Sequence, residues 1–226
     1  MYRLASSMSL CVLAVTTACQ GSTVTEFPDG LAPLEELQVA VPEGDGRDAF
    51  PEAVNIASGE TEEYYWGHAA GFVHAPVADV WAALQEPDVN VDRLRVDEWT
   101  ANWDVPTDFD VAYQIDHTVY DVLTVEWTVE WRHGAVSGSA EEPEAVGGRW
   151  QKVEGTTFIT TLQGSFALYE VDEAITQVEF IEHLSALQSS EEDIVNFFTD
   201  MYAEVVSIAH GDGLPAAEDL PTAQAE

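Results

Sequence analysis

Residues 174–210 read AITQVEFIEHLSALQSSEEDIVNFFTDMYAEVVSIAH, and this stretch decides the fold. Its first part alternates between apolar and polar side chains, which is typical of a strand with one buried face. The buried side would carry Thr176, Val178, Phe180 and Leu184, and the opposite side Glu179 and His183. We therefore expect one strand of a sheet here, with Glu179 and His183 toward solvent.

A long helix is expected directly after this strand. Ser189 and Glu192 match a Ser-x-x-Glu capping box, which is the signature of a helix N-terminus. Apolar residues then repeat at three- and four-residue spacing and give the helix one broad apolar face: Ile194, Phe197, Phe198, Met201, Val205 and Ile208. Gly211 and Gly213 would end the helix. A terminal helix of this kind needs a large concave partner.

The chain before residue 174 is rich in predicted strands. The clearest alternation lies in residues 123–131, where Leu123, Val125, Trp127, Val129 and Trp131 share one side. Further strands are expected over 62–75, 95–105, 109–120, 149–154 and 157–172. A helix is expected over 77–85, a second short helix or turn over 88–93, and a loop over 133–148.

These elements predict an α+β fold in which a curved antiparallel sheet of about seven strands wraps around the long C-terminal helix. One or two short helices would follow the first strand. We expect a signal peptide over 1–18, an acidic linker with prolines and glycines over 19–60, the folded domain over 61–211 and an acidic tail over 212–226.

Three stretches resemble the START-like superfamily, also called SRPBCC or polyketide cyclase/dehydrase. They read GFVHAPVADVWAAL over 71–84, GSFALY over 164–169 and TQVEF over 176–180. The resemblance implies the helix-grip fold, with a hydrophobic cavity between the sheet and the long helix. Members of the superfamily bind lipids, sterols, polyketides or other apolar molecules, and a minority catalyse cyclisation or dehydration.

Bulky apolar side chains on the inward faces of the predicted strands and helix are the candidate ligand-binding residues. They are Tyr113, Trp127, Trp131, Phe166, Phe180, Phe198 and Met201. This is more aromatic surface than a tight core usually needs. The leading hypothesis is non-enzymatic binding or transport of a hydrophobic small molecule or lipid. The alternatives are a cyclase/dehydratase-like enzyme that uses the same cavity, and an envelope interaction module in which these rings fill the core.

The sequence predicts no catalytic residue, metal site or cofactor. His68 and His74 lie about 20 Å apart along one strand, which is too far to share a metal ion. Tyr113 and His117 could supply an acid or base, but Asp116 would point away from both. No glycine-rich phosphate loop precedes a helix, so a nucleotide cofactor is not expected.

The overall charge is strongly negative. The chain has 42 Asp and Glu residues against 7 Lys and Arg residues, a formal net charge of −35 at pH 7. Such a surface repels phosphate groups, so nucleic acid is not an expected partner. Two explanations of the acidity stay open. One is the self-repelling surface of an exported protein, and the other is adaptation to high salt, where ions screen the repulsion.

The N-terminus has the layout of an export signal, with Arg3, an apolar run and small residues before Cys19. Residues 15–19 resemble the bacterial lipobox, in which the cysteine is acylated, although Thr16 stands where that motif has Leu, Val or Ile. Plain cleavage after Ala18 is the alternative. We expect an exported cell-envelope protein, an outer-membrane lipoprotein or a periplasmic protein, with a lipid anchor on Cys19 as its membrane contact.

Overall fold

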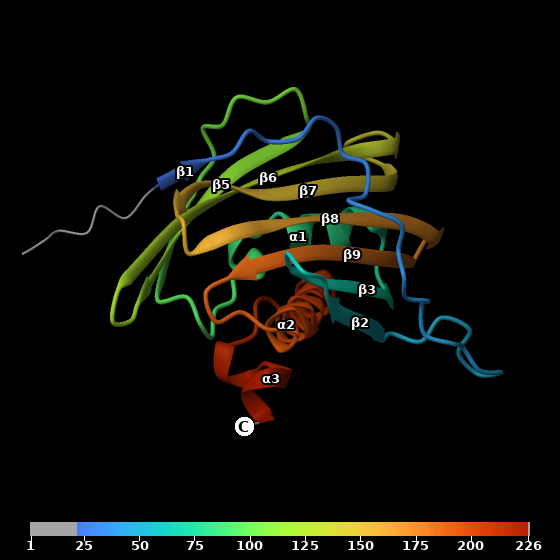
Figure 1. Ribbon diagram of the computed structural model, residues 1–226. Coiled ribbons are helices and arrows are strands. Elements are labelled where there is room, and N and C mark those ends of the chain that lie inside the picture. The colour runs from blue at the N-terminus through green and yellow to red at the C-terminus, as the bar shows by residue number, and fades with distance from the viewer. Residues whose placement is uncertain (1–21, 226) are drawn as a thin grey trace, which may run out of the picture.

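An antiparallel sheet curves around helix α2 in the computed structural model, which describes residues 22–225 (Figure 1). The strands are β1 Ser22–Val24, β2 Val54–Glu60, β3 Tyr65–Val73, β4 Glu98–Asn102, β5 Val111–Tyr120, β6 Thr124–Gly138, β7 Pro143–Thr156, β8 Ile159–Asp172 and β9 Ile175–Ala186. The helices are α1 Val77–Leu84, η1 Pro87–Asn90, α2 Glu191–Ala209, η2 Ala217–Asp219 and α3 Pro221–Gln224. The predicted signal peptide and Cys19 lie outside the described residues. In the described part, no helix is long and apolar enough to cross a membrane.

Eight strands form one antiparallel path in the order β2-β3-β9-β8-β7-β6-β5-β4, and β1 pairs with the end of β7. Helices α1 and α2 pack on the concave face: α1 contacts β7, β8 and β9, and α2 contacts β2, β3 and β9. The predicted α+β class is confirmed. The described sheet has nine strands rather than about seven, because β1 and β2 come from the range predicted as linker.

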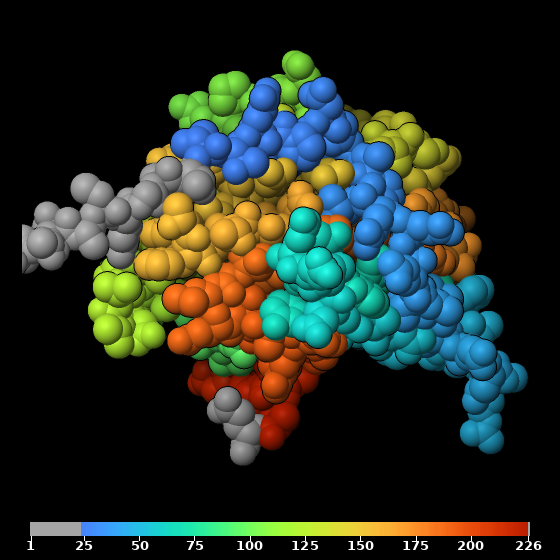
Figure 2. All heavy atoms as spheres, in the orientation of Figure 1, coloured from blue at the N-terminus to red at the C-terminus, as the bar shows by residue number. Residues whose placement is uncertain are grey.

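Part of the convex face of the sheet is covered by the chain that precedes β2, drawn in blue in Figure 2. The Leu34 backbone N–H donates a hydrogen bond to Ser165 Oγ on β8 at 2.8 Å. One oxygen of Glu35 lies 2.8 Å from His68 Nε2 and 3.2 Å from His183 Nε2. The expectation that His183 faces solvent is therefore wrong, because a segment without periodic pattern lies over it.

The prediction of a loop over residues 133–148 is also wrong. Strand β6 continues to Gly138 and β7 begins at Pro143, so only residues 139–142 connect them. The glycines in this range look like loop residues, but they allow close packing across the sheet. A Cβ on Gly148 would lie 2.0 Å from the ring of Phe166. Tertiary contact selects glycine there, and a local pattern cannot show this.

Two segments predicted as linker and tail contribute to the folded structure. Strand β2, within the range 19–60, pairs along its whole length with β3. Within the range 212–226, Leu220 is buried, and Thr222 donates hydrogen bonds to Asp200 on α2. Each segment contributes only one or two apolar residues to the core, Val54 and Ile56 from β2 and Leu220 from the tail, which is too few for the apolar periodicity that identifies an element in a sequence.

Helix α2 begins one residue later than the predicted capping box. Ser190 is the N-cap, and its N–H donates to Asp193 Oδ2 at 2.7 Å. The predicted pair was Ser189 and Glu192, but the Ser189 hydroxyl bonds the backbone of Ala186 and closes the turn after β9. Asp193 is also bound by a distant arginine, which favours the later start.

Candidate functional site

A cavity of about 610 Å³ lies between the concave face of the sheet and the first turns of α2. Its wall is mostly apolar and includes Val125 and Trp127 from β6, Leu162 from β8, Leu184 from β9 and Phe197 from α2. Cavities that hold small molecules typically span about 300–1,000 Å³ and are lined in this way. The dimensions and the lining therefore suit a small apolar ligand.

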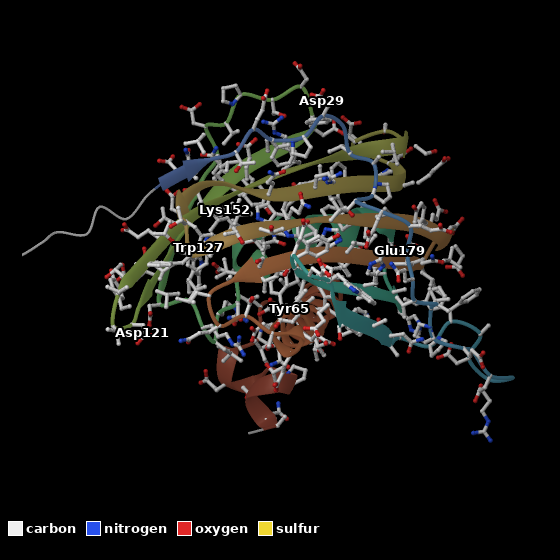
Figure 3. All side chains as sticks on the ribbon, in the orientation of Figure 1. Asp29, Tyr65, Asp121, Trp127, Lys152 and Glu179 are labelled. Carbon is white, nitrogen blue, oxygen red and sulfur yellow. The ribbon has the colours of Figure 1, made fainter. Side chains whose placement is uncertain are left out.

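The exposed part of the cavity wall comes from three turns that meet at one end of the sheet. Val122 and Leu123 lie on the β5–β6 turn, Phe158 on the β7–β8 turn and Leu187 on the β9–α2 turn. Val122, Leu123 and Leu187 are exposed although they are apolar. Figure 3 shows Asp121, on the first of these turns, and Trp127 at the same end of the sheet, opposite Glu179. This end is the mouth of the cavity.

The inner end of the cavity lies at one row of residues that crosses the sheet, of which Trp131, Trp150 and Glu182 line the cavity. The strand registers place Tyr113, Trp131, Trp150, Gly164 and Glu182 opposite one another on β5, β6, β7, β8 and β9. The rings of Tyr113 and Trp131 are stacked with their centroids 6.4 Å apart, and the rings of Trp131 and Trp150 are stacked with their centroids 4.6 Å apart. Trp131 and Glu182 are the lining residues of β6 and β9 that lie furthest along their strands from the mouth.

Gly164 allows this row to reach Glu182. A Cβ at Gly164 would lie 2.0 Å from Trp150 Cζ2, so the indole occupies the space above β8 that a side chain would fill. Trp150 Nε1 thereby donates a hydrogen bond to Glu182 Oε2 at 3.2 Å. Burial raises the pKa of Glu182 to about 8. The hydrogen bond from Trp150 lowers this pKa, and the charge of Asp92 raises it further. The carboxyl therefore keeps its proton at neutral pH.

His117 lines the cavity closer to the mouth and stacks on Trp127, with ring centroids 4.8 Å apart. Burial lowers the pKa of His117 to about 4, so the imidazole is neutral at pH 7. His117 is on β5 and Glu182 on β9, four strands away in the sheet order. The two residues therefore do not form an acid–base pair.

A charged group closes the cavity beside α2. Arg95 forms an ion pair with Asp193 in the first turn of α2. The Nε atom of Arg95 also lies 3.8 Å from Asp92 Oδ2. Burial raises the pKa of Asp92, while Arg95 opposes this rise. Two carboxyl groups thus engage the guanidinium. Among residues 22–225, no group of three or more His, Cys, Asp or Glu side chains is arranged to hold a metal ion.

Four residues of the cavity wall carry a buried polar atom that has no hydrogen-bond partner within residues 22–225. These atoms are Asn90 Oδ1, His117 Nδ1, Trp127 Nε1 and Trp131 Nε1. Buried polar groups without partners are uncommon in folded proteins, because each costs about 1–3 kcal/mol. All four atoms are inaccessible from the cavity, so they lie behind its surface and do not point into it.

Solved structures share this architecture. Human StAR-related lipid transfer protein 5 superimposes with a TM-score of 0.50 at 11% sequence identity, over 72% of this chain and 85% of that chain. The chain has the helix-grip fold. The lipid transfer and protein localization domain of human StarD13 gives a TM-score of 0.47 at 12% identity, over 72% and 85% of the two chains. The Zhui aromatase/cyclase from Streptomyces gives a TM-score of 0.39 at 9% sequence identity, over 71% of this chain and 93% of that chain. No protein-family model and no curated protein matches the sequence.

The helix-grip domain brings two of the seven predicted ligand-binding residues, Trp127 and Trp131, into the cavity wall. The other five are buried in the core beside the cavity: Tyr113, Phe166, Phe180, Phe198 and Met201. Tyr113 is enclosed by α1, where its hydroxyl donates a hydrogen bond to the Leu84 carbonyl at 3.3 Å, and Phe198 by the close approach of α2 to β3. A Cβ at Gly67 would lie 2.2 Å from Ile194 Cγ2. At this end the helix-grip fold is filled, and space remains only toward the mouth.

Glu182 is absent from the predicted site, although the sequence contains a signal for it. Glu182 lies between Phe180 and Leu184 on the face of β9 that was predicted to be buried. A single carboxyl between bulky apolar residues on one strand face indicates a buried acid. Its neighbours Trp150 and Gly164 come from other strands, so the local pattern does not show what stabilises it.

Proposed function

We propose that this helix-grip domain binds and carries a hydrophobic small molecule or lipid in the cavity beneath α2. The observation that carries the proposal is the cavity itself, about 610 Å³ with an apolar wall and exposed apolar residues at its mouth. Exposed apolar side chains around an opening favour entry of an apolar molecule. A module with a filled core would lack such a space, so the interaction-module alternative has less support.

The comparison with a solved structure agrees with this ligand class. The human protein with a TM-score of 0.50 is named for lipid transfer. The TM-score supports a common fold, whereas the ligand of this chain is inferred from its own cavity wall.

A cyclase/dehydratase-like enzyme is the second candidate, and Glu182 is the observation that favours it. A buried acid that keeps its proton at neutral pH suits general acid catalysis. Such chemistry also needs a second group near the reacting atoms. The other lining residue with a large pKa shift, His117, lies four strands away. A binding role therefore fits the wall better.

The binding proposal is tested with a fluorescent apolar probe, N-phenylnaphthylamine, and a variant that fills the cavity. Val125 lines the cavity, so Val125→Trp should weaken probe binding at least tenfold. Val136→Trp is the matched control, because Val136 is on the same strand but exposed and outside the cavity wall. Absence of probe binding to the native chain, or equal weakening by both variants, would contradict the proposal.

We also propose that the domain is exported and held at a membrane through acyl chains on Cys19. The lipobox-like residues 15–19 support this proposal. In cells, Cys19→Ala should move the protein from the membrane fraction to the soluble fraction and abolish incorporation of labelled fatty acid. A variant that stays in the membrane fraction with undiminished labelling would exclude Cys19 as the anchor.

A further inference from the structure

We infer that the cavity selects apolar molecules that carry one uncharged hydroxyl or carbonyl oxygen at their leading end, and that Glu182 binds this oxygen at the inner end of the cavity. This inference rests on the proposed binding function and makes it specific. It concerns a polar site within the apolar wall rather than the wall as a whole.

The position of Glu182 is the first argument. Glu182 lies in the innermost row of the wall, five residues before the exposed Leu187 at the mouth, which is about 16 Å along an extended strand. A chain-like apolar molecule that enters end-first would bring its leading atom to this row. The molecule would lie along the apolar side chains in between.

The hydrogen-bonding state of Glu182 is the second argument. Oε2 accepts the bond from Trp150 Nε1, and within residues 22–225 the carboxyl makes no other hydrogen bond. Because the carboxyl keeps its proton at neutral pH, it can donate one hydrogen bond and accept another. A hydroxyl or carbonyl oxygen would satisfy this capacity, whereas a hydrocarbon end would leave it unused.

Trp131 stacks on Trp150 and also belongs to the cavity wall. The polar atoms Trp131 Nε1 and Asn90 Oδ1 have no partner within residues 22–225, but both are inaccessible from the cavity. Glu182 therefore supplies the polar group at the inner end of the cavity.

The charges nearby exclude an anionic leading group. Arg95 is the cation of the cavity wall, and Asp193 and Asp92 already engage it. A carboxylate brought to the inner end would lose its hydration and would face the negative charge of Asp92, in a chain whose net charge is −35. An uncharged oxygen avoids this repulsion and its desolvation cost.

Competition against bound N-phenylnaphthylamine tests the inference, with the full chain carrying Cys19→Ser at pH 7. The competitors are n-dodecanol, n-dodecane and dodecanoate, which share one chain length and differ at the end. We expect n-dodecanol to compete about tenfold better than n-dodecane, the factor that one additional hydrogen bond gives. Glu182→Leu should abolish this preference, and Glu182→Gln, which can still donate and accept, should retain most of it.

The outcomes separate this inference from the proposed function. If the probe itself does not bind, the proposed function fails. If the probe binds but n-dodecanol and n-dodecane compete equally, or if dodecanoate competes best, only this inference fails. Retention of the preference in a folded Glu182→Leu chain would also overturn it. Should Glu182→Leu not fold by circular dichroism, Glu182→Met serves in its place.

Discussion

The indole of Trp150 lies over Gly164, with Cζ2 only 2.0 Å from the position that a Cβ on Gly164 would take. This contact lets Trp150 cross strand β8 and bond Glu182 on β9. The inner wall of the cavity therefore depends on the absence of a side chain at residue 164.

Gly164→Ala should displace Trp150 and lower the free energy of unfolding by about 1–3 kcal/mol, since the added methyl group overfills a closed site. Chemical denaturation followed by tryptophan fluorescence measures this change. Gly46→Ala is the control, because an added Cβ there meets no atom within 4 Å. Equal stability of the two variants would show that Trp150 does not require the space.

Glu182 should make the protein less stable as the pH rises. Its pKa is about 8 in the folded chain against an ordinary value of 4.5, so between these pH values the folded state holds a proton that the unfolded state has lost. Stability then falls with rising pH, by at most ~1.4 kcal/mol per pH unit, and levels off above pH 8. The charged groups on the adjoining walls are Asp92, Arg95 and Asp193, and Asp92 raises the pKa further.

Glu182→Gln should remove this dependence, so its advantage over the native chain should grow from about pH 5 to pH 8. Urea denaturation at a series of pH values measures the difference. Glu179→Gln, a change on the opposite face of the same strand, should leave the slope unchanged. A native slope that persists in Glu182→Gln would assign the pH dependence to another group.

His133 should destabilise the fold in acid. Its imidazole is fully buried and accepts a hydrogen bond at Nδ1 from Trp81 Nε1 at 2.8 Å. Burial lowers the pKa of His133 to about 3, so as the pH falls from 6.5 toward 3 the unfolded chain gains a proton that the folded chain does not bind. Stability is then lost, by at most ~1.4 kcal/mol per pH unit.

His133→Gln keeps an acceptor for Trp81 but cannot titrate, so its stability should fall less steeply below pH 6.5. Denaturation at pH 4, 5 and 6.5 compares the slopes, whatever the absolute stability of the variant. His74→Gln is the control, because His74 is exposed in the bend that directly follows β3. Identical slopes in the native chain and His133→Gln would refute the assignment.

Arg93 should be essential for the docking of α2. Glu204 is buried, Arg93 is largely buried, and Arg93 Nε donates a hydrogen bond to Glu204 Oε1 at 2.8 Å. Arg93→Met leaves a buried carboxyl without its partner and should cost about 3–5 kcal/mol, measured by denaturation. The double variant with Glu204→Met should recover most of this loss. Arg47→Met, on an exposed residue, should have no measurable effect, and a similarly small effect of Arg93→Met would show that the pair is dispensable.

The elements that the sequence predicted well are those with strong local periodicity. The alternation around Trp127 and Trp131 identified β6, and the three- and four-residue spacing from Ile194 onward identified α2. Elements without an apolar stripe were missed. Strand β2 is held by backbone pairing with β3, and residues 133–148 contain glycines that are selected by contacts from other strands.

The sequence by itself determined the fold class and the face of each main strand, because side-chain periodicity is a local property of the chain. Only the tertiary structure decided where the cavity lies. The close approach of α2 to Gly67 fills one end of the fold with Phe198 and its neighbours and leaves space at the other. The tertiary structure also placed Trp150, Gly164 and Glu182 in one row, because register across strands joins residues that are distant in the chain.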